Sequence, residues 1–209
     1  MSTARNSKQI TLRGSAEIVV EFFEYCLNSI LFQRGLYPPE DFRPVKKYGL
    51  AMMVAINESL NAYLRQVLTQ VGEWITANAI TKLVMVISSK DTREVVERWQ
   101  FNILLERDPR TEPAHHSSVP LEPKSEKVIQ AEIAAIMRQI TASASFLPLL
   151  DDPCTFNILA YTDKNAEVPA TWAESDARLI TRNAEQVKLR SFSTSVHRVE
   201  GLVAYRLGE

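Results

Sequence analysis

Three side chains near the C-terminal end carry the groups of a nucleophile and a base: Ser193, Ser195 and His197. If this stretch is a strand, residues two apart point in the same direction, so a hydroxyl and the imidazole would share one face. A hydrolase also needs an orienting acid and donors for an oxyanion. The chain has no Gly-x-Ser-x-Gly segment, and the other histidines, His115 and His116, lie in a proline-rich stretch. The sequence therefore does not predict an enzyme, and a hydrolase using His197 is the weakest hypothesis.

The other groups that could bind a metal or a cofactor are equally poor candidates. The adjacent histidines and the pair Asp151–Asp152 are neighbours without distant partners, which do not make a coordination shell. Cys26 and Cys154 form neither a disulfide framework nor a metal-binding spacing, so we expect two small, mostly buried side chains in a reducing compartment. The glycines follow no phosphate-binding or dinucleotide-binding pattern. We expect no metal and no cofactor.

Composition narrows the class of protein further. A formal net charge of −1 lacks the cationic excess that general nucleic-acid binding needs. No apolar run is long enough to span a bilayer, and the N-terminus does not resemble a secretory signal. With 209 residues, 45% of them hydrophobic, the chain can bury a sizeable core. We expect a soluble intracellular protein that binds neither nucleic acid nor membrane.

A long helix is predicted near the N-terminus. Ser15 is a candidate N-cap, and Gly35 can adopt the left-handed conformation that ends a helix. Between them, two adjacent apolar rows repeat at a spacing of four: Ile18, Phe22, Cys26 and Ile30, and Val19, Phe23, Leu27 and Leu31. Two such rows make a wide stripe, so this helix should be buried on much of its circumference.

Strands and two further helices should follow. Residues 45–56 are a candidate strand or hairpin weakened by Gly49, and Asn57 should cap a second helix. The apolar run 82–88 predicts a central strand covered on both faces, and the alternation over 98–106 predicts its half-covered antiparallel partner. A third helix should begin near Ser125 and stop before Pro148, with this inner face: Val128, Ile129, Ile133, Ile136, Met137 and Ile140.

The remaining segments before residue 164 are a strand, a loop and an N-terminal tail. Residues 154–161 alternate as a third strand, and the proline-rich stretch 107–124 should be a loop. Residues 1–9 are expected to be a frayed tail or a weak edge strand. The order of elements predicts an α+β fold, with three helices packed on a mostly antiparallel sheet.

The last 45 or so residues have no helical periodicity, and their strand pattern changes phase. Val187 and Leu189 share one parity, whereas Phe192 and Val196 share the other. A shift of one residue turns every later side chain to the opposite face. This segment therefore requires a bulge or two separate strands. Its register is weakly specified, so it could pack on the core in more than one way.

Four blocks of sequence give the chain a family resemblance. They are residues 10–42, WQFNI at 99–103, RQITASASFLPLL at 138–150 and LRSFSTSVH at 189–197. In this order they resemble the HORMA-domain family, in its spindle-checkpoint branch, from about Ile10 to Tyr205. The resemblance implies one HORMA domain over residues 1–209, with a core at 10–163 and a mobile β "safety belt" at 164–209.

The resemblance also implies a two-state switch that captures peptides. In the open state the C-terminal segment lies on the sheet edge where a ligand would bind. In the closed state it crosses to the opposite edge and encloses an extended peptide, which is added as a strand. The implied role is in the spindle assembly checkpoint, where the protein delays anaphase. The next hypothesis is a related HORMA adaptor of translesion synthesis and DNA repair.

Several partners and locations follow from the same resemblance. The expected ligands are a coiled-coil checkpoint protein (mitotic arrest deficient one) at unattached kinetochores and the β-propeller activator of the anaphase-promoting complex. A comet-type HORMA inhibitor, an AAA+ remodelling ATPase, a BubR-type kinase-like protein and a second copy of the chain are also expected. The implied locations are the nucleus, kinetochore, nuclear envelope and cytoplasm.

Finally, the resemblance assigns roles to individual residues. From the residues alone, an exposed Arg138 is an ordinary solvated charge and Trp74 an ordinary core residue. The resemblance instead assigns self-association and inhibitor binding to Arg138, Gln139, Phe146, Arg190 and Arg34. It assigns the peptide-binding site and the belt to Trp74, Ile158, Tyr161, Trp172, Phe192, Val196 and His197. Leu12, expected ahead of the first helix, is assigned control of the conformation.

Overall fold

The computed structural model describes residues 10–106 and 124–207. The predicted N-terminal tail, the proline-rich loop up to residue 123 and both of its histidines, His115 and His116, lie outside the described residues. The described elements are α1 (Leu12–Gln33), β1 (Phe42–Lys47), β2 (Leu50–Ala55), α2 (Glu58–Thr76), β3 (Ile80–Ser89), β4 (Val95–Leu105), α3 (Glu126–Ser143), β5 (Cys154–Thr162), β6 (Ala184–Ser193) and β7 (His197–Arg206). A short 3-10 turn, Pro39–Asp41, precedes β1.

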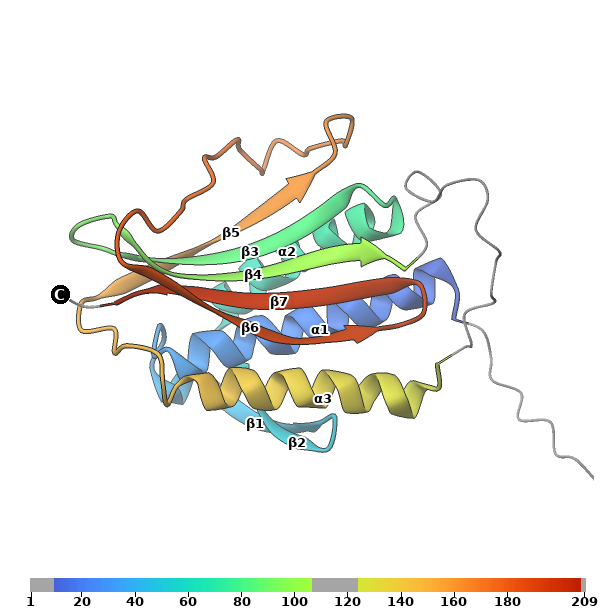
Figure 1. Cartoon of the computed structure of the whole chain (residues 1–209), viewed down its shortest axis with the longest axis horizontal. Helices are drawn as coiled ribbons and strands as arrows, with labels where there is room; N and C mark the ends of the chain where they lie inside the picture. Colours follow the sequence, from blue (N-terminus) through green and yellow to red (C-terminus); the bar gives the residue numbers. More distant parts are fainter. Residues whose placement is uncertain (1–9, 107–123, 208–209) are drawn as a thin grey trace, which may run out of the picture.

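The main sheet has five antiparallel strands in the order β5-β3-β4-β7-β6 (Figure 1). The three helices pack together on one face of it, so the α+β prediction is confirmed. The two outer strands differ in origin. β5 follows α3 directly, whereas β6 belongs to the C-terminal hairpin. That hairpin joins the sheet by pairing β7 with β4.

The first helix has the predicted stripe but a different start. Thr11 is the N-cap, and its hydroxyl accepts a hydrogen bond from the Gly14 amide at 3.1 Å. The prediction of Ser15 as cap is therefore wrong: Ser15 lies inside the helix and is fully buried. Leu12, expected ahead of the helix, is its first residue. At the other end Gly35 has φ +62°, the left-handed conformation predicted for it.

Strands β1 and β2 form a separate two-stranded sheet rather than part of the main one. Tyr48 and Gly49 both have positive φ, which is the geometry of a tight hairpin turn, so Gly49 makes the hairpin instead of weakening a strand. This hairpin packs on α1, where the Asn28 side chain accepts a hydrogen bond from the Ala55 amide at 2.8 Å.

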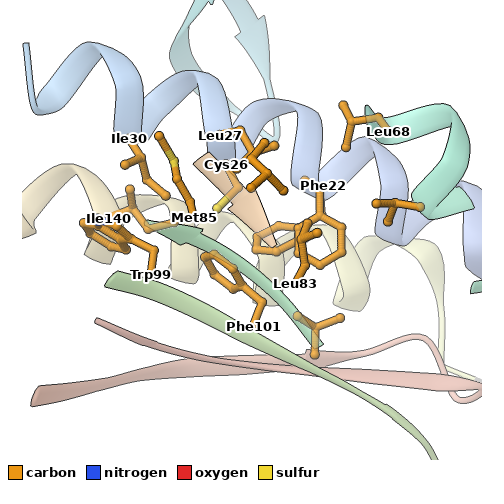
Figure 2. Close-up of a cluster of buried hydrophobic side chains, with 14 of the residues drawn as sticks. Phe22, Cys26, Leu27, Ile30, Leu68, Leu83, Met85, Trp99, Phe101 and Ile140 are labelled. Carbon is orange, nitrogen blue, oxygen red and sulfur yellow. The ribbon is translucent and has the colours of Figure 1, made fainter. Parts of the chain in front are cut away.

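The core lies between α1 and the inner face of the central strands (Figure 2). Phe22 of α1 and Phe101 of β4 pack edge to face, with ring centroids 5.8 Å apart. The prediction for residues 82–88 is also confirmed, because Val84 and Val86, on the opposite face of β3, are fully buried. Each of these buried aromatic and branched side chains contributes roughly 1.5–3 kcal/mol to folding.

The third helix and the tail agree with the sequence patterns in most respects. Ser125 caps α3, which ends five residues before Pro148. Val128 is 45% exposed, so it does not belong to the inner face predicted for it. In β6 the pairing with β7 shifts between Lys188 and Ser191, which is the bulge required by the change of phase.

Candidate functional site

The outer edge of β5 is the first functional feature. β5 pairs with β3 on one side only. The Pro153 carbonyl and the Asp163 amide, at the two ends of this strand, face β3, so the Ile158 amide, of the opposite parity, points away from it. Backbone groups of an antiparallel strand alternate in direction, so Phe156 and Ala160 also turn their N–H and C=O groups outward. This edge can therefore accept another strand.

Residues 163–183, which we call the belt segment, run alongside that edge. In Figure 1 they return along β5 before the chain crosses to β6 at the far side of the sheet. The Trp74 indole N–H donates to the Glu167 carbonyl at 2.9 Å, and its ring packs edge to face on Trp172 with centroids 4.9 Å apart. Further along, the Arg178 guanidinium donates to the Ser88 hydroxyl at 3.2 Å. These contacts attach the belt segment to the rest of the domain on both sides of the β5 edge.

Three cavities follow the β5 edge in sequence. One of about 490 Å³ lies at its C-terminal end, between Ile158 and Trp172. A second, of about 300 Å³, lies beside the middle of the strand, between Tyr63 and the belt residues from Thr171 to Arg178. The third, of about 560 Å³, lies at the start of the strand, and no belt residue lines it. Together they outline a groove that passes beneath the belt segment.

The groove is mixed in polarity. Asp163, Glu174 and Asp176 line the cavity at the C-terminal end of β5, together with Lys164. The Tyr63 phenol lies at the middle of the groove, where burial raises its pKa above the ordinary value of 10.0 and the Ile158 amide partly opposes that shift. Amides, hydroxyls and aromatic faces therefore line a path that an extended chain could follow.

The tail hairpin is fixed to the core at the opposite edge of the sheet. The Phe192 ring packs on Phe22 at 4.9 Å. At the hairpin turn, His197 Nδ1 lies 2.7 Å from the Ser15 hydroxyl, which lies 2.5 Å from that of Thr194. Burial lowers the pKa of His197, and its Nε2 atom is buried without a hydrogen-bond partner among the described residues. The cluster joins the first turns of α1 to the hairpin, and Ser193 and Ser195 are not part of it.

A second feature lies where α3 meets the hairpin. The Gln139 side chain accepts a hydrogen bond from the Arg190 amide at 2.6 Å, and Arg190 sits in the bulge of β6. Arg138 is exposed on α3, and Phe146, just beyond the helix, is 47% exposed. The structure thus brings together α3 and β6 residues into one surface, which we call the α3–β6 surface.

Arg34 is not on that surface but underneath it. Its side chain is 5% exposed and its Nε lies 2.9 Å from the Glu97 carboxylate. Its Nη2 donates to the Pro148 carbonyl at 2.6 Å, in the segment that carries Phe146. Burial raises the pKa of Glu97, while Arg34 and the Trp99 indole oppose the shift. Arg34 is therefore a buried contact to the segment that carries Phe146 and is not itself exposed on the surface.

The predicted peptide-binding residues separate into two groups. Trp74, Ile158, Tyr161 and Trp172 line the groove. Phe192, Val196 and His197 belong to the hairpin region at the other edge of the sheet, and the first and last of them are buried there. These three residues therefore belong to the attachment of the hairpin to the core and do not line the groove.

Sequence reasoning missed several residues of the site. Tyr63 continues the helical row of Val67, Val71 and Trp74, so it was detectable as the exposed end of that row. The contribution of Ser15 could not be detected, because its partners are more than 170 residues away along the chain. The same holds for Arg178, whose partner is Ser88.

Two other kinds of feature are absent from residues 10–106 and 124–207. There, no group of three or more histidine, cysteine, aspartate and glutamate side chains is arranged to hold a metal ion. In the same ranges, no helix has the length and apolarity needed to cross a membrane.

Comparison with known proteins adds the family. The HORMA-domain model matches residues 15–197. The Schizosaccharomyces pombe mitotic spindle checkpoint component mad2 is 47% identical, over 99% of both chains. The human mitotic spindle assembly checkpoint protein MAD2A is 50% identical, over 95% of this chain and 93% of its own.

Solved structures agree with these relatives. A chain in the crystal structure of the mitotic checkpoint complex is 48% identical and superposes with a TM-score of 0.82, over 93% of this chain and 99% of that one. Caenorhabditis elegans HTP-1, solved with a HIM-3 closure motif, superposes with a TM-score of 0.72 over 97% and 98% of the two chains. At 13% identity that likeness shows the fold alone. The names of the close relatives favour the checkpoint over the DNA-repair hypothesis. This chain belongs to the HORMA-domain family and, within it, to the spindle assembly checkpoint proteins of the MAD2 type.

Proposed function

We propose that this checkpoint protein captures an extended peptide as a sixth strand on β5 and holds it beneath the belt segment. The observation that carries the proposal is the arrangement of the tail. Its hairpin pairs with β4, so the edge of β5 stays accessible while the belt segment spans it. Backbone hydrogen bonds would supply affinity, and the cavities along the groove would select side chains. Enclosure by the belt would make dissociation slow.

We infer that this tail arrangement is the closed state of a two-state switch. In the open state the hairpin would occupy the β5 edge and exclude the ligand. The bulged register of β6 supports this inference, because a strand with weakly specified register can pair in more than one way. The core, residues 10–163, would change little, and residues 164–209 would act as the mobile belt.

The ligands that we propose are the coiled-coil checkpoint protein and the β-propeller activator of the anaphase-promoting complex. The close match to a chain of the mitotic checkpoint complex supports checkpoint partners of this kind. Capture of the activator would delay anaphase. The expected sites of action are unattached kinetochores, with further pools in the nucleus, at the nuclear envelope and in the cytoplasm.

For the α3–β6 surface we propose self-association between open and closed copies. The hydrogen bond from Arg190 to Gln139 requires the hairpin to lie beside α3, so this surface would be complete only in the closed arrangement. The same surface would receive the comet-type inhibitor. The AAA+ ATPase would then remodel the tail, and the BubR-type protein would join the activator complex.

Peptide capture can be tested by removing one outward-pointing backbone N–H group of β5. Ala160→Pro removes an outward N–H, and an edge strand tolerates proline there because the pairing with β3 uses the other side. We expect a fluorescein-labelled peptide from the coiled-coil partner to bind the Pro variant about tenfold more weakly, and to dissociate faster, than the wild type. Ala160→Val, which keeps the N–H, is the matched control. Equal affinity of all three proteins, measured by anisotropy, would contradict strand addition at β5.

The mobility of the belt needs a separate measurement. Hydrogen exchange should show the amides of 164–207 exchanging faster than those of α1 and β3 in the free protein, and slowing when the same peptide is added. Equal protection throughout, unchanged by peptide, would refute the switch.

A further inference from the structure

The cavity at the start of β5 has its own chemistry. We call it the outer cavity. Its apolar walls come from three directions: the segment after α1, the first turns of α2 and β5 itself. The rings of Tyr37 and Tyr63 both face Phe156 edge to face, with centroids 6.3 and 5.7 Å away. Leu36 and Leu60 complete the apolar part. The three rings offer an aromatic wall to a large apolar side chain, beside a polar part of the lining that includes Asn57, Ser59 and Thr155.

The outer cavity is lined by a positive charge, whereas the charged groups that line the cavity at the C-terminal end of β5 are mainly carboxylates. Among the described residues, Lys90 is the one charged side chain that lines the outer cavity, in the turn between β3 and β4. The Lys90 backbone is held there, because its amide donates to the Pro153 carbonyl at 2.8 Å. The exposed ammonium group therefore lies beside the apolar walls, where it would attract a carboxylate.

The outer cavity continues the groove beyond the belt segment. Tyr63 and Asn157 line both this cavity and the middle one, so the two are adjacent. Belt residues between Asp163 and Arg178 line the other two cavities, and none of them is in the lining of this one. Of β5, Asn157 to Leu159 line the middle cavity and Cys154 to Asn157 line the outer one, so a peptide paired along β5 would pass directly from one cavity to the other.

We propose that the outer cavity is a specificity subsite for the part of the captured peptide that emerges from the belt, and that it prefers a large apolar residue followed by acidic ones. The inference rests on the proposed function, since it needs a strand on β5. The proposed occupant is the continuation of the bound peptide, because a strand added to β5 would lie at the entrance of the cavity. The acidic preference comes from Lys90.

The experiment compares extended forms of one labelled peptide from the coiled-coil partner. The peptide is lengthened by one Phe and two Asp residues, with Phe nearest to the core sequence, at either its N-terminus or its C-terminus. Matched peptides carry Gly-Ser-Ser at the same ends. We expect the Phe-Asp-Asp extension at one end to raise affinity about tenfold over its Gly-Ser-Ser control.

Variants of the protein separate the contribution of charge. Lys90→Glu should remove about fivefold of that gain, because it replaces attraction by repulsion, and should leave the affinity for the unextended peptide unchanged. Arg93→Glu, in the same turn but outside the lining of the cavity, is the matched control and should keep the full gain.

The outcomes distinguish the two proposals. If the unextended peptide binds and neither extension adds affinity, the subsite is refuted while peptide capture stands. If the extension gains affinity equally in the wild type and in Lys90→Glu, the acidic preference is refuted. If the unextended peptide does not bind at all, both the proposed function and this inference fail.

Discussion

Arg34 and Glu97 form a buried ion pair beneath the C-terminal end of α1. Their side chains are 5% and 1% exposed, and the carboxylate also accepts a hydrogen bond from the Trp99 indole at 2.5 Å. Two charges taken out of water are tolerated only when both are paired and hydrogen-bonded. The pair therefore costs little while it is intact and much when one partner is removed.

We expect Arg34→Ala to destabilise the protein by about 3–5 kcal/mol, because it leaves the Glu97 carboxylate buried and unpaired. Chemical denaturation followed by circular dichroism measures the change. The double variant Arg34→Met with Glu97→Gln should recover most of the loss, since no buried charge remains. A loss below about 1 kcal/mol in the single variant would mean that the pair is not buried in solution.

His197 should make attachment of the tail depend on pH. Burial lowers its pKa in the folded protein below the ordinary 6.5, so a detached or unfolded tail binds a proton more readily than the docked one. The stability that His197 contributes is complete above about pH 6.5 and is lost as the pH falls toward the lowered value.

Urea denaturation at pH 7.5 and at pH 6.0 tests the direction of this pH dependence of stability. The wild type should be less stable at pH 6.0, and His197→Asn, which does not titrate, should show a smaller difference. The ion pairs Arg198–Glu200, next to His197 in the chain, and Lys124–Glu132 are common to both proteins. A wild type that becomes more stable on acidification over this range would contradict the assignment.

At the scale of elements, α3 and β6 depend on each other. α3 presents Arg138 to solvent and offers Gln139 to the hairpin, while the bulge of β6 brings Arg190 to Gln139. A regular strand would continue its alternation through this point and direct the backbone differently. The bulge is therefore what allows one surface to include both elements.

We expect Arg138→Ala to weaken self-association about tenfold or more, because exposed arginines at the centre of an interface often dominate its energy. The same substitution should leave peptide affinity unchanged, since Arg138 lies away from the groove. Sedimentation velocity and anisotropy measure the two effects. Lys127→Ala, exposed in the first turn of the same helix, is the control. If the variant dimerised as strongly as the wild type, Arg138 would not be part of the self-association surface.

At the scale of the whole molecule, the position of the C-terminal hairpin decides which strand of the sheet has a free edge. With the hairpin on β4, the five strands leave β5 at the outer edge and the belt segment beside it. Binding of a peptide there would stabilise this arrangement over any other in proportion to its differential affinity for it. In the proposed switch, ligand binding, the belt and the α3–β6 surface would be linked through the position of one hairpin.

Local patterns predicted much of this architecture. The i+4 rows of α1, the apolar run of β3 and the alternation of β4 each depend on neighbours within one element, so they could be read directly. The change of phase near Arg190 predicted the bulge for the same reason. Thr11 displaced Ser15 as the helix cap because Ser15 has a distant partner in the hairpin, which no local pattern records.

The sequence by itself determined the helices, the strands and the irregular register of the tail, since these follow from the spacing of apolar side chains. Only the tertiary structure decided which edge the tail occupies, that Arg34 is buried with Glu97, and that Tyr63, Trp74 and the belt segment meet at β5. The physical reason is that such contacts join residues far apart in the chain. Their free energies depend on packing that forms only when all the elements are assembled.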